Sequence, residues 1–371
     1  MAGLYIHIPF CHHKCIYCDF YSIAQSFDKT RYVQALTKEI EYRKAFLEEP
    51  LQTIYFGGGT PSTLSLDLLE RIFVSISQNL VLISQNEVSF EANPEDISLD
   101  YVKGLKELGI NRISLGVQSF EDKDLKLLNR SHNADMAKKA IETIQKAGIS
   151  NISIDLISNL PNTTLESWQK NLETFLAFKL PHISCYTLMR EEGTMLDKLL
   201  NKKKLSLLTE EESLQQLDLT MQILEQNGYE HYETSSFAQP NYQSRHNKAY
   251  WTFASYLGIG AGAHSYKEGL RTWNENDVFA YTNRIFAGDF DNTNRQEQLS
   301  QKDKYNEYVM LSARMKNGLS LEYVKSNFAD YHDYFCKQID KAKQQGFLNN
   351  DLSLTNKAWH LQDELILSLA L

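Results

Sequence analysis

The sequence predicts an α/β protein in which six consecutive β-α units build a parallel sheet. Two observations predict it. Through the first half of the chain, short β-rich runs alternate with amphipathic stretches of helical period, and a capping residue precedes each of these stretches. Six right-handed units can curl into a barrel or lie as an open, doubly wound sheet, and periodicity alone leaves both arrangements possible.

The predicted elements follow one another regularly. The strands are expected at residues 4–8, 53–56, 87–91, 112–115, 152–157 and 183–188. A helix follows each strand but the last, at residues 29–47, 66–78, 99–108, 134–147 and 165–178. Five side chains suit the N-cap positions of these helices: Asp28, Ser65, Ser98, Asn133 and Thr164. Gly109 and Gly148 suit the C-terminal ends of two helices.

The pattern changes after Gly193. A long helix is expected at residues 210–226, and a glycine-rich segment follows at 257–264. From about residue 304, three short helices lead to a hairpin-like turn at 346–354 and a closing amphipathic helix. We therefore expect three parts: a β-α core at 1–192, an accessory α+β region at 193–300, and a small helical, winged-helix-like end at 301–371.

Composition and charge narrow the possible functions. The 371 residues are 42% hydrophobic and 23% charged, as in ordinary globular proteins, and no apolar run approaches the ~20 residues of a membrane span. The first residues lack the features of a secretory signal. A net charge of −9 argues against nucleic acid as the main partner. The five cysteines do not resemble a secreted disulfide framework, so we expect a cytoplasmic protein.

Cys11, Cys15 and Cys18 lie in one short segment directly after the first predicted strand. Cysteine thiolates hold iron–sulfur clusters, usually four at a time, so three ligands on one loop leave an iron free for a cofactor or substrate. Zinc is the rival interpretation, but a structural zinc site needs a fourth ligand, which would have to be His12, His13 or a distant residue. Three incidental thiols are the remaining alternative. The spacing favours an iron–sulfur cluster.

Glycines and polar residues gather after the next predicted strands. Gly57-Gly58-Gly59-Thr60-Pro61 follows the second strand, and Glu91, Gln118 and Asp155 stand at or near the ends of the third, fourth and fifth. Because the carboxyl ends of parallel strands share one edge, these residues should lie near the cysteine loop. Each alone could be a turn or a sheet-end ion pair, such as Glu91 with Arg130. Their shared position favours a binding site.

The segment from Cys11 to Cys18, with Tyr17 before the last cysteine, resembles the Cys-x3-Cys-x2-Cys motif of the radical SAM superfamily. Over residues 4–270 the chain is most similar to the oxygen-independent coproporphyrinogen-oxidase-like branch, whose opening matches Tyr5-Ile6-His7-Ile8-Pro9-Phe10. The resemblance implies a partial (β/α)6 TIM-like barrel with a C-terminal α+β extension. It also implies a [4Fe–4S] cluster on the three cysteines, with S-adenosylmethionine (SAM) bound to the open iron.

The resemblance also implies which residues contact SAM. The matching positions in this chain are Tyr5, Tyr17, Gly58, Gly59, Thr60, Glu91, Gln118, Arg130 and Asp155. Tyr17 would flank the adenine, and the bare glycine backbone would lie against the methionine end, because only glycine lets a main chain approach so closely. Members of this branch can hold one or two SAM molecules, and the sequence leaves the number open.

Two departures separate this chain from the true oxidases of the branch. Their motif resembles Cys-x3-Cys-x2-Cys-x-Cys, whereas this chain reads Cys18-Asp19-Phe20, and they carry an extension ahead of the first strand. In both respects this chain resembles instead the haem-chaperone group of the branch. This resemblance implies that the protein binds haem and transfers it to apo-haemoproteins such as respiratory cytochromes. The alternative is an oxidase that decarboxylates coproporphyrinogen III by means of a 5′-deoxyadenosyl radical.

His246 is the candidate haem ligand from this comparison, since His246-Asn247-Lys248-Ala249-Tyr250-Trp251 resembles a His-Asn-x-x-Tyr-Trp segment of the haem-chaperone group. A neutral imidazole is a common axial ligand of haem iron, and the neighbouring rings could stack on a porphyrin. Alternatively, this histidine satisfies a buried turn and the rings belong to the core. His12 and His13 could also meet haem, but solvent exposure is the simpler expectation.

Overall fold

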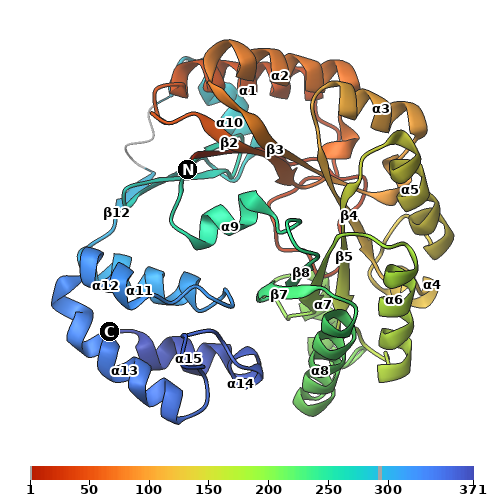
Figure 1. The fold of residues 1–371 in the computed structure, drawn as a ribbon. Helices are drawn as coiled ribbons and strands as arrows, with labels where there is room; N and C mark the ends of the chain where they lie inside the picture. Colours follow the sequence, from red (N-terminus) through yellow and green to blue (C-terminus); the bar gives the residue numbers. More distant parts are fainter. Residues whose placement is uncertain (1, 291–294) are drawn as a thin grey trace.

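The computed structural model describes residues 2–290 and 295–371, and a twelve-stranded sheet forms its centre (Figure 1). The strands are β1 (Ala2–Ile8), β2 (Leu51–Gly58), β3 (Leu82–Ala92), β4 (Arg112–Gln118), β5 (Asn151–Ser158), β6 (His182–Thr187), β7 (Glu230–Glu233), β8 (Ser236–Ala238), β9 (Ser255–Ile259), β10 (His264–Lys267), β11 (Leu270–Trp273) and β12 (Gln296–Gln298). Their order across the sheet is β12-β11-β10-β9-β1-β2-β3-β4-β5-β6-β8-β7.

The six predicted strands, β1 to β6, lie side by side in chain order, and each pair of neighbours is parallel. The predicted β-α repeat is therefore confirmed. Apolar side chains such as Leu4, Phe56 and Ile154 are fully buried, so the sheet packs under its helices in one continuous core. The sheet curves but its two edges do not pair with each other within residues 2–290 and 295–371, so the barrel is partial (Figure 1).

Six helices cover the outer face of the parallel strands (Figure 1). They are α1 (Lys29–Arg43), α2 (Leu66–Asn79), α3 (Leu99–Glu107), α4 (Asp122–Leu127), α5 (Ala134–Ala147) and α6 (Leu165–Ala177). The side chains of Asp28, Ser98, Asn133 and Thr164 accept backbone hydrogen bonds at the helix N-termini, as predicted. Ser65 occupies the N-cap position of α2 as predicted, although its side chain makes no capping hydrogen bond.

Several boundaries differ from the sequence-based expectation. Helix α1 ends at Arg43 rather than at residue 47. The guanidinium of Arg43 donates a hydrogen bond to the carbonyl of Gly258 at 3.0 Å. Strand β3 begins five residues earlier than predicted, at Leu82, and the short helix α4 was not predicted. A seventh parallel strand, β9, pairs with β1 on the side opposite β2. Gly258 lies in β9, and a side chain there would collide with the backbone of His264, which explains why this strand lacks the usual β-rich composition.

The region after residue 193 extends the same sheet at both edges. Strands β7 and β8 add antiparallel to β6, whereas β10, β11 and β12 add antiparallel beyond β9. The helices of this region are α7 (Met195–Asn201), α8 (Glu210–Gln226), α9 (Arg245–Trp251) and α10 (Val278–Phe286). Helix α9 packs on β2 and β3, on the inner side of the curved sheet (Figure 1). The division into 1–192, 193–300 and 301–371 stays a prediction.

The last part of the chain is helical. It contains α11 (Gln301–Ser312), α12 (Leu321–Asn327), α13 (His332–Gln344), α14 (Asn356–His360) and α15 (Gln362–Leu369). Leu348 and Leu354 form an isolated antiparallel bridge at the predicted hairpin-like turn. The closing helix is divided into α14 and α15. No helix among residues 2–290 and 295–371 is both long and apolar enough to cross a bilayer.

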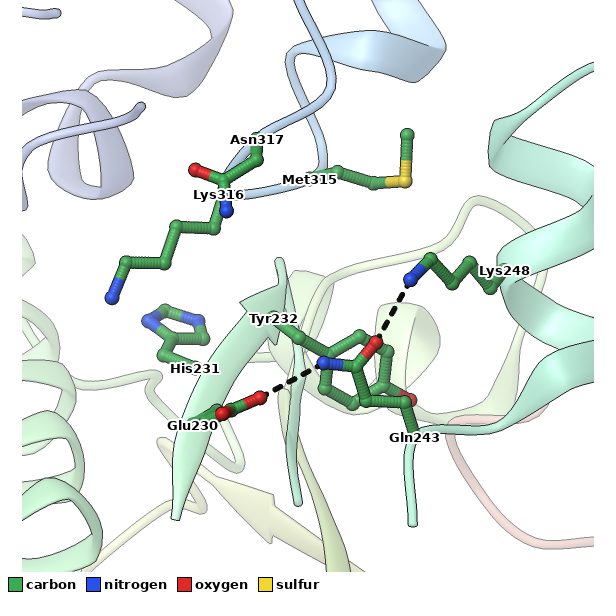
Figure 2. Close-up of a pocket in the computed structure, with 8 residues that line it drawn as sticks. All are labelled: Glu230, His231, Tyr232, Gln243, Lys248, Met315, Lys316 and Asn317. Carbon is green, nitrogen blue, oxygen red and sulfur yellow. Dashed lines mark hydrogen bonds between the residues drawn. The ribbon is translucent and has the colours of Figure 1, made fainter. Parts of the chain in front are cut away.

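The helical end docks on the sheet edge at β7. The N–H of Lys316 donates to the carbonyl of Tyr232 at 3.1 Å, and the imidazole of His231 lies between the rings of Phe237 and Trp359, 4.1 Å from each. Figure 2 shows the cavity of about 290 Å³ at this junction, where Lys316 faces His231 across the gap. Since none of the residues predicted to bind a cofactor lines this cavity, it is a feature of the docking interface.

Glu39 of α1 is a buried carboxylate, 1% exposed, that fastens this helix to the glycine-rich turn after β9. Its oxygens accept hydrogen bonds from the N–H of Gly260 at 2.9 Å, the hydroxyl of Tyr281 at 2.7 Å and the amide of Asn274 at 2.8 Å. Arg43, one turn later, supplies the opposite charge at 3.3 Å. A buried charge held by several donors stabilises the fold mainly because its loss would leave those donors unsatisfied.

Substitution Glu39→Ala is therefore expected to lower the free energy of unfolding by about 3–5 kcal/mol. Glu41→Ala provides the matched control, because Glu41 is an exposed carboxylate on the same helix, and it should change the stability by less than about 0.5 kcal/mol. Urea denaturation of both variants measures the difference. Equal stabilities would contradict the role given to Glu39.

Candidate functional site

The loop after β1 carries Cys11, Cys15 and Cys18, and its two ends are tied together. The N–H of Cys11 donates to the carbonyl of Ile23 at 2.9 Å, and the N–H of Ile23 donates to the carbonyl of Pro9 at 2.7 Å. The three thiols are free, half-buried and line one cavity of about 390 Å³. Strand β1 therefore presents the three predicted cluster ligands together at the carboxyl edge of the sheet.

Two hydrogen-bond donors face these thiols. The hydroxyl of Thr60 donates to Sγ of Cys11 at 3.4 Å, and Nη1 of Arg130 donates to Sγ of Cys15 at 3.4 Å. Burial raises the pKa of the Cys11 thiol, and it raises the pKa of the Cys18 thiol to about 11. Cys11 and Cys18 are therefore protonated at neutral pH until a metal displaces the protons. Thr60 and Arg130 can then stabilise the negative charge on sulfur.

The thiols fit a cluster better than a single zinc ion. The cysteines of a [4Fe–4S] cube bind different irons, so they surround a larger volume than the ligands of one zinc, which lie about 2.0–2.3 Å from it. Here the three thiols line an open cavity, and no group of three or more His, Cys, Asp or Glu side chains in the described part of the chain is arranged around one ion.

Most of the residues expected to contact SAM line the same cavity. These are Tyr17, Gly58, Gly59, Thr60, Glu91, Gln118, Arg130 and Asp155. They come from the cysteine loop, from the end of β2 and the residues after it, from the ends of β3 and β4, from the middle of β5, and from the segment after α4. Tyr5 does not line the cavity: its hydroxyl bonds to Nδ1 of His7 at 3.0 Å and its ring stacks on Tyr55. Tyr5 therefore supports residues near the cavity.

Gly58 and Gly59 bring bare backbone to the cavity. The N–H of Gly59 donates to the carbonyl of Ile8 at 2.8 Å, and a side chain at Gly59 would press on the main chain of Ile8, Pro9 and Phe10 at 2.9 Å. Gly58 has a φ of +109°, and a side chain there would collide with the ring of His7. Both positions need glycine because β2 approaches β1 and the cysteine loop so closely, and together they form a cradle of bare backbone at the cavity.

Substitution Gly58→Ala is expected to weaken SAM binding by about tenfold or more, because it combines an unfavourable φ with displacement of the His7 ring. Gly109→Ala is the matched control: its φ is +98°, but no atom lies within 4 Å of the added methyl group. Calorimetric titration of both reconstituted variants with SAM gives the comparison. The cradle would be refuted by the same affinity in both.

Two buried carboxyl groups form part of the cavity wall. Glu91 accepts a hydrogen bond from the hydroxyl of Tyr55 at 2.7 Å, and Asp155 accepts one from Ser114 at 3.3 Å. Burial raises the pKa of Glu91 to about 7 and that of Asp155 to about 6. Both groups therefore change charge near neutral pH, which suits them to respond to a cationic or hydroxyl-bearing ligand.

Arg130 is fixed by groups other than Glu91. Its Nη2 donates to Oδ1 of Asn93 at 2.7 Å and to the carbonyl of Gly116 at 2.9 Å. The alternative of a simple Glu91–Arg130 ion pair is therefore not formed. Gln118 closes the same wall with a φ of +67° and a nearly buried side chain. Such a backbone conformation is unusual outside glycine and is concentrated at binding sites.

Sequence reasoning missed several residues that line the cavity. Phe20, Tyr186, Leu188, Met189 and Glu191 line it together with the predicted set. Four of them follow or end β6, the one strand for which the sequence singled out no polar or glycine residue. The only available signal was their position after a parallel strand, because apolar side chains at such a place are usually assigned to the core.

His246 is placed far from solvent. It is 1% exposed, its Nδ1 bonds to Thr53 at 2.8 Å, and its Nε2 bonds to the hydroxyl of Tyr250 at 3.0 Å. Its ring also stacks on Tyr55, and burial lowers its pKa to about 3. In this structure both ring nitrogens make hydrogen bonds with side-chain hydroxyls, as expected for the alternative of a buried histidine. Haem ligation by His246 stays a prediction.

Comparison with known proteins agrees with this geometry. Residues 5–175 match the family described as the Radical SAM superfamily. Heme chaperone HemW of Lactococcus lactis is 38% identical over 96% of this chain and 94% of its own length, and Heme chaperone HemW of Bacillus subtilis is 37% identical over 95% and 94%. The solved structure of coproporphyrinogen III oxidase (HemN) from Escherichia coli, described as a radical SAM enzyme, superimposes with a TM-score of 0.84 over 99% of this chain and 89% of that chain, at 23% identity.

The cysteine loop, the strand-end cavity and the partial barrel thus define a radical SAM protein. Membership of this class implies a [4Fe–4S] cluster and SAM. The likeness to HemN supports the fold, since at this identity it says nothing further. Within the class, the full-length identities show that this chain belongs to the HemW family.

Proposed function

We propose that this protein is a haem chaperone that holds a [4Fe–4S] cluster on Cys11, Cys15 and Cys18 and SAM in the adjoining cavity. The observation that carries the proposal is the meeting of three thiols and a glycine-lined cradle at one cavity, in a chain that matches proteins named Heme chaperone HemW over nearly its whole length. Haem is the cargo, and apo-haemoproteins such as respiratory cytochromes, reached from the cytoplasm, are the proposed acceptors.

The cavity residues have separate tasks in this proposal. A bound cluster would supply an open iron that chelates the methionine end of SAM. The backbone at Gly58 and Gly59 gives room for that end, and Tyr17 covers the adenine. Glu91 and Asp155 bind polar groups of SAM from the opposite wall. Thr60 donates to Sγ of Cys11, which stabilises its thiolate.

Arg130 and Gln118 complete the polar lining. The guanidinium of Arg130 lies between Cys15 and Asn93, at hydrogen-bond distance from both, so it can balance the negative charge of the thiolates. Arg130 also donates to the carbonyl of Gly116, which ties the end of β4 to the cysteine loop. Gln118 presents an amide to the cavity from the residue where β4 ends.

The experiment that tests the proposal is anaerobic reconstitution with iron and sulfide, followed by titration with SAM and haem and by incubation with coproporphyrinogen III. The expected result is close to four irons and four sulfides per chain with absorbance near 400 nm, stable haem binding, and transfer of haem to an apo-cytochrome without vinyl product. Turnover to vinyl product would favour the oxidase alternative. A preparation that binds zinc but no iron would overturn both.

A further inference from the structure

The mouth of the SAM cavity exposes large apolar side chains. Phe20 of the cysteine loop is 70% exposed, and Met189 and Tyr186, beyond and at the end of β6, are 64% and 44% exposed. All three line the same cavity. Apolar side chains that line a cavity and are this exposed are typical of a binding surface for an apolar ligand rather than of a folded core.

One histidine at this mouth is without a hydrogen-bond partner. His12 bonds through Nε2 to Asp96 at 2.8 Å, whereas its neighbour His13 is exposed, lines the cavity and makes no ring hydrogen bond with any residue in the described part of the chain. An imidazole with both edges free can bind a metal ion through one nitrogen. His13 thus differs from His12 and from the enclosed His246.

A basic hollow of about 800 Å³ adjoins the mouth. It shares Lys14, Cys15, Cys18 and Asp19 with the SAM cavity, so the two spaces adjoin at the cysteine loop. Three exposed lysines line the hollow: Lys14, Lys126 and Lys198. Asp19 and Glu192 offset part of this charge. An apolar rim next to clustered ammonium groups complements a flat molecule that is apolar over its ring and carboxylated at one edge.

We propose that haem binds across the mouth of the SAM cavity, with its ring against Phe20, Tyr186 and Met189, its iron bound by His13, and its propionates directed to the lysine-lined hollow. The proposal rests on the proposed function for the identity of the ligand and adds the place where it binds. Haem in this position lies over the cavity rather than inside the barrel, so it remains accessible to an acceptor protein.

The test uses the full-length, cluster-loaded protein and measures absorbance and dissociation constants with haem and with metal-free protoporphyrin IX. His13→Ala should shift the Soret band and weaken haem binding about tenfold or more, while protoporphyrin binding stays within about twofold. His12→Ala is the matched control and should leave the Soret band unchanged. Phe20→Ser and Met189→Ser should each weaken the binding of both haem and protoporphyrin IX by about three- to tenfold.

A separate experiment tests the lysine-lined hollow. Lys198→Ala should weaken haem binding by about two- to fivefold but leave binding of haem dimethyl ester, which lacks both carboxylates, unchanged. Every variant is compared at equal iron and sulfide content, and His13→Gln replaces His13→Ala if the latter loses its cluster.

The outcomes separate the two proposals. If the unmodified protein binds no haem, the proposed function fails. If it binds haem, but the rim and His13 variants bind it with the same affinity and spectrum, the function stands and the mouth is the wrong place. A Soret shift in His12→Ala with none in His13→Ala overturns the assignment of the iron ligand.

Discussion

Replacing Cys15 by alanine is expected to abolish the iron–sulfur cluster, with iron and sulfide content falling close to zero after anaerobic reconstitution. Among the described residues three thiols line the cavity, so the loss of one leaves two, which is too few to hold the cluster. Absorbance near 400 nm should disappear together with SAM binding. Elemental analysis and the absorption spectrum measure the effect.

Cys336→Ser provides the control for this variant. Cys336 lies in α13 of the helical end and contacts His332, away from the cavity. Its loss should leave iron content, absorbance and SAM affinity unchanged. If Cys15→Ala retained a full complement of iron and sulfide, the assignment of the three cysteines as the cluster ligands would be wrong.

SAM affinity is expected to depend steeply on pH between about 5.5 and 8. Burial raises the pKa of Glu91 to about 7 and that of Asp155 to about 6 in the free protein. The sulfonium charge of SAM and its ribose hydroxyls favour the ionised carboxylates, so the carboxyl groups release their protons on binding. Affinity should therefore be highest above pH 7 and should fall as the pH drops through 7 and 6, by tenfold to a hundredfold at pH 5.5.

The two carboxyl groups can be told apart by isosteric variants. Glu91→Gln should remove the fall in affinity that begins near pH 7 and keep the one near pH 6, whereas Asp155→Asn should do the reverse. Calorimetry of the cluster-loaded protein in several buffers also counts the protons released. An affinity that stays constant from pH 8 to pH 5.5, with the cluster intact, is incompatible with ionised carboxylates at the binding surface.

The part of the fold that the sequence predicted well is the part in which local pattern and tertiary environment agree. Strands β1 to β6 are apolar because helices cover them, and the residue before most of the helices is a capping side chain whose effect is local. Strand β9 was missed because Gly258 is required by the close approach of β10, a contact that periodicity does not record.

The site shows the same division. Cys11, Glu91 and Asp155 could be predicted to lie together because the carboxyl ends of parallel strands share one edge, whatever the details of the loops. His246 could not be placed from its motif, since a histidine that satisfies Thr53 and Tyr250 reads the same in sequence as one that binds a metal. The apolar residues at the mouth could not be predicted for a related reason. In the sequence Phe20 and Met189 resemble core residues, and only the structure shows that they are exposed.

The position of β1 inside the sheet has a consequence for how the protein matures. This strand has hydrogen-bonded neighbours on both flanks, β2 and β9, and its loop is closed at the base by backbone hydrogen bonds and by the bond between His7 and the carbonyl of Tyr21. None of these interactions needs iron. We therefore expect the sheet around β1 to stay folded when the cluster is lost, so that iron and sulfide can be restored to the existing chain.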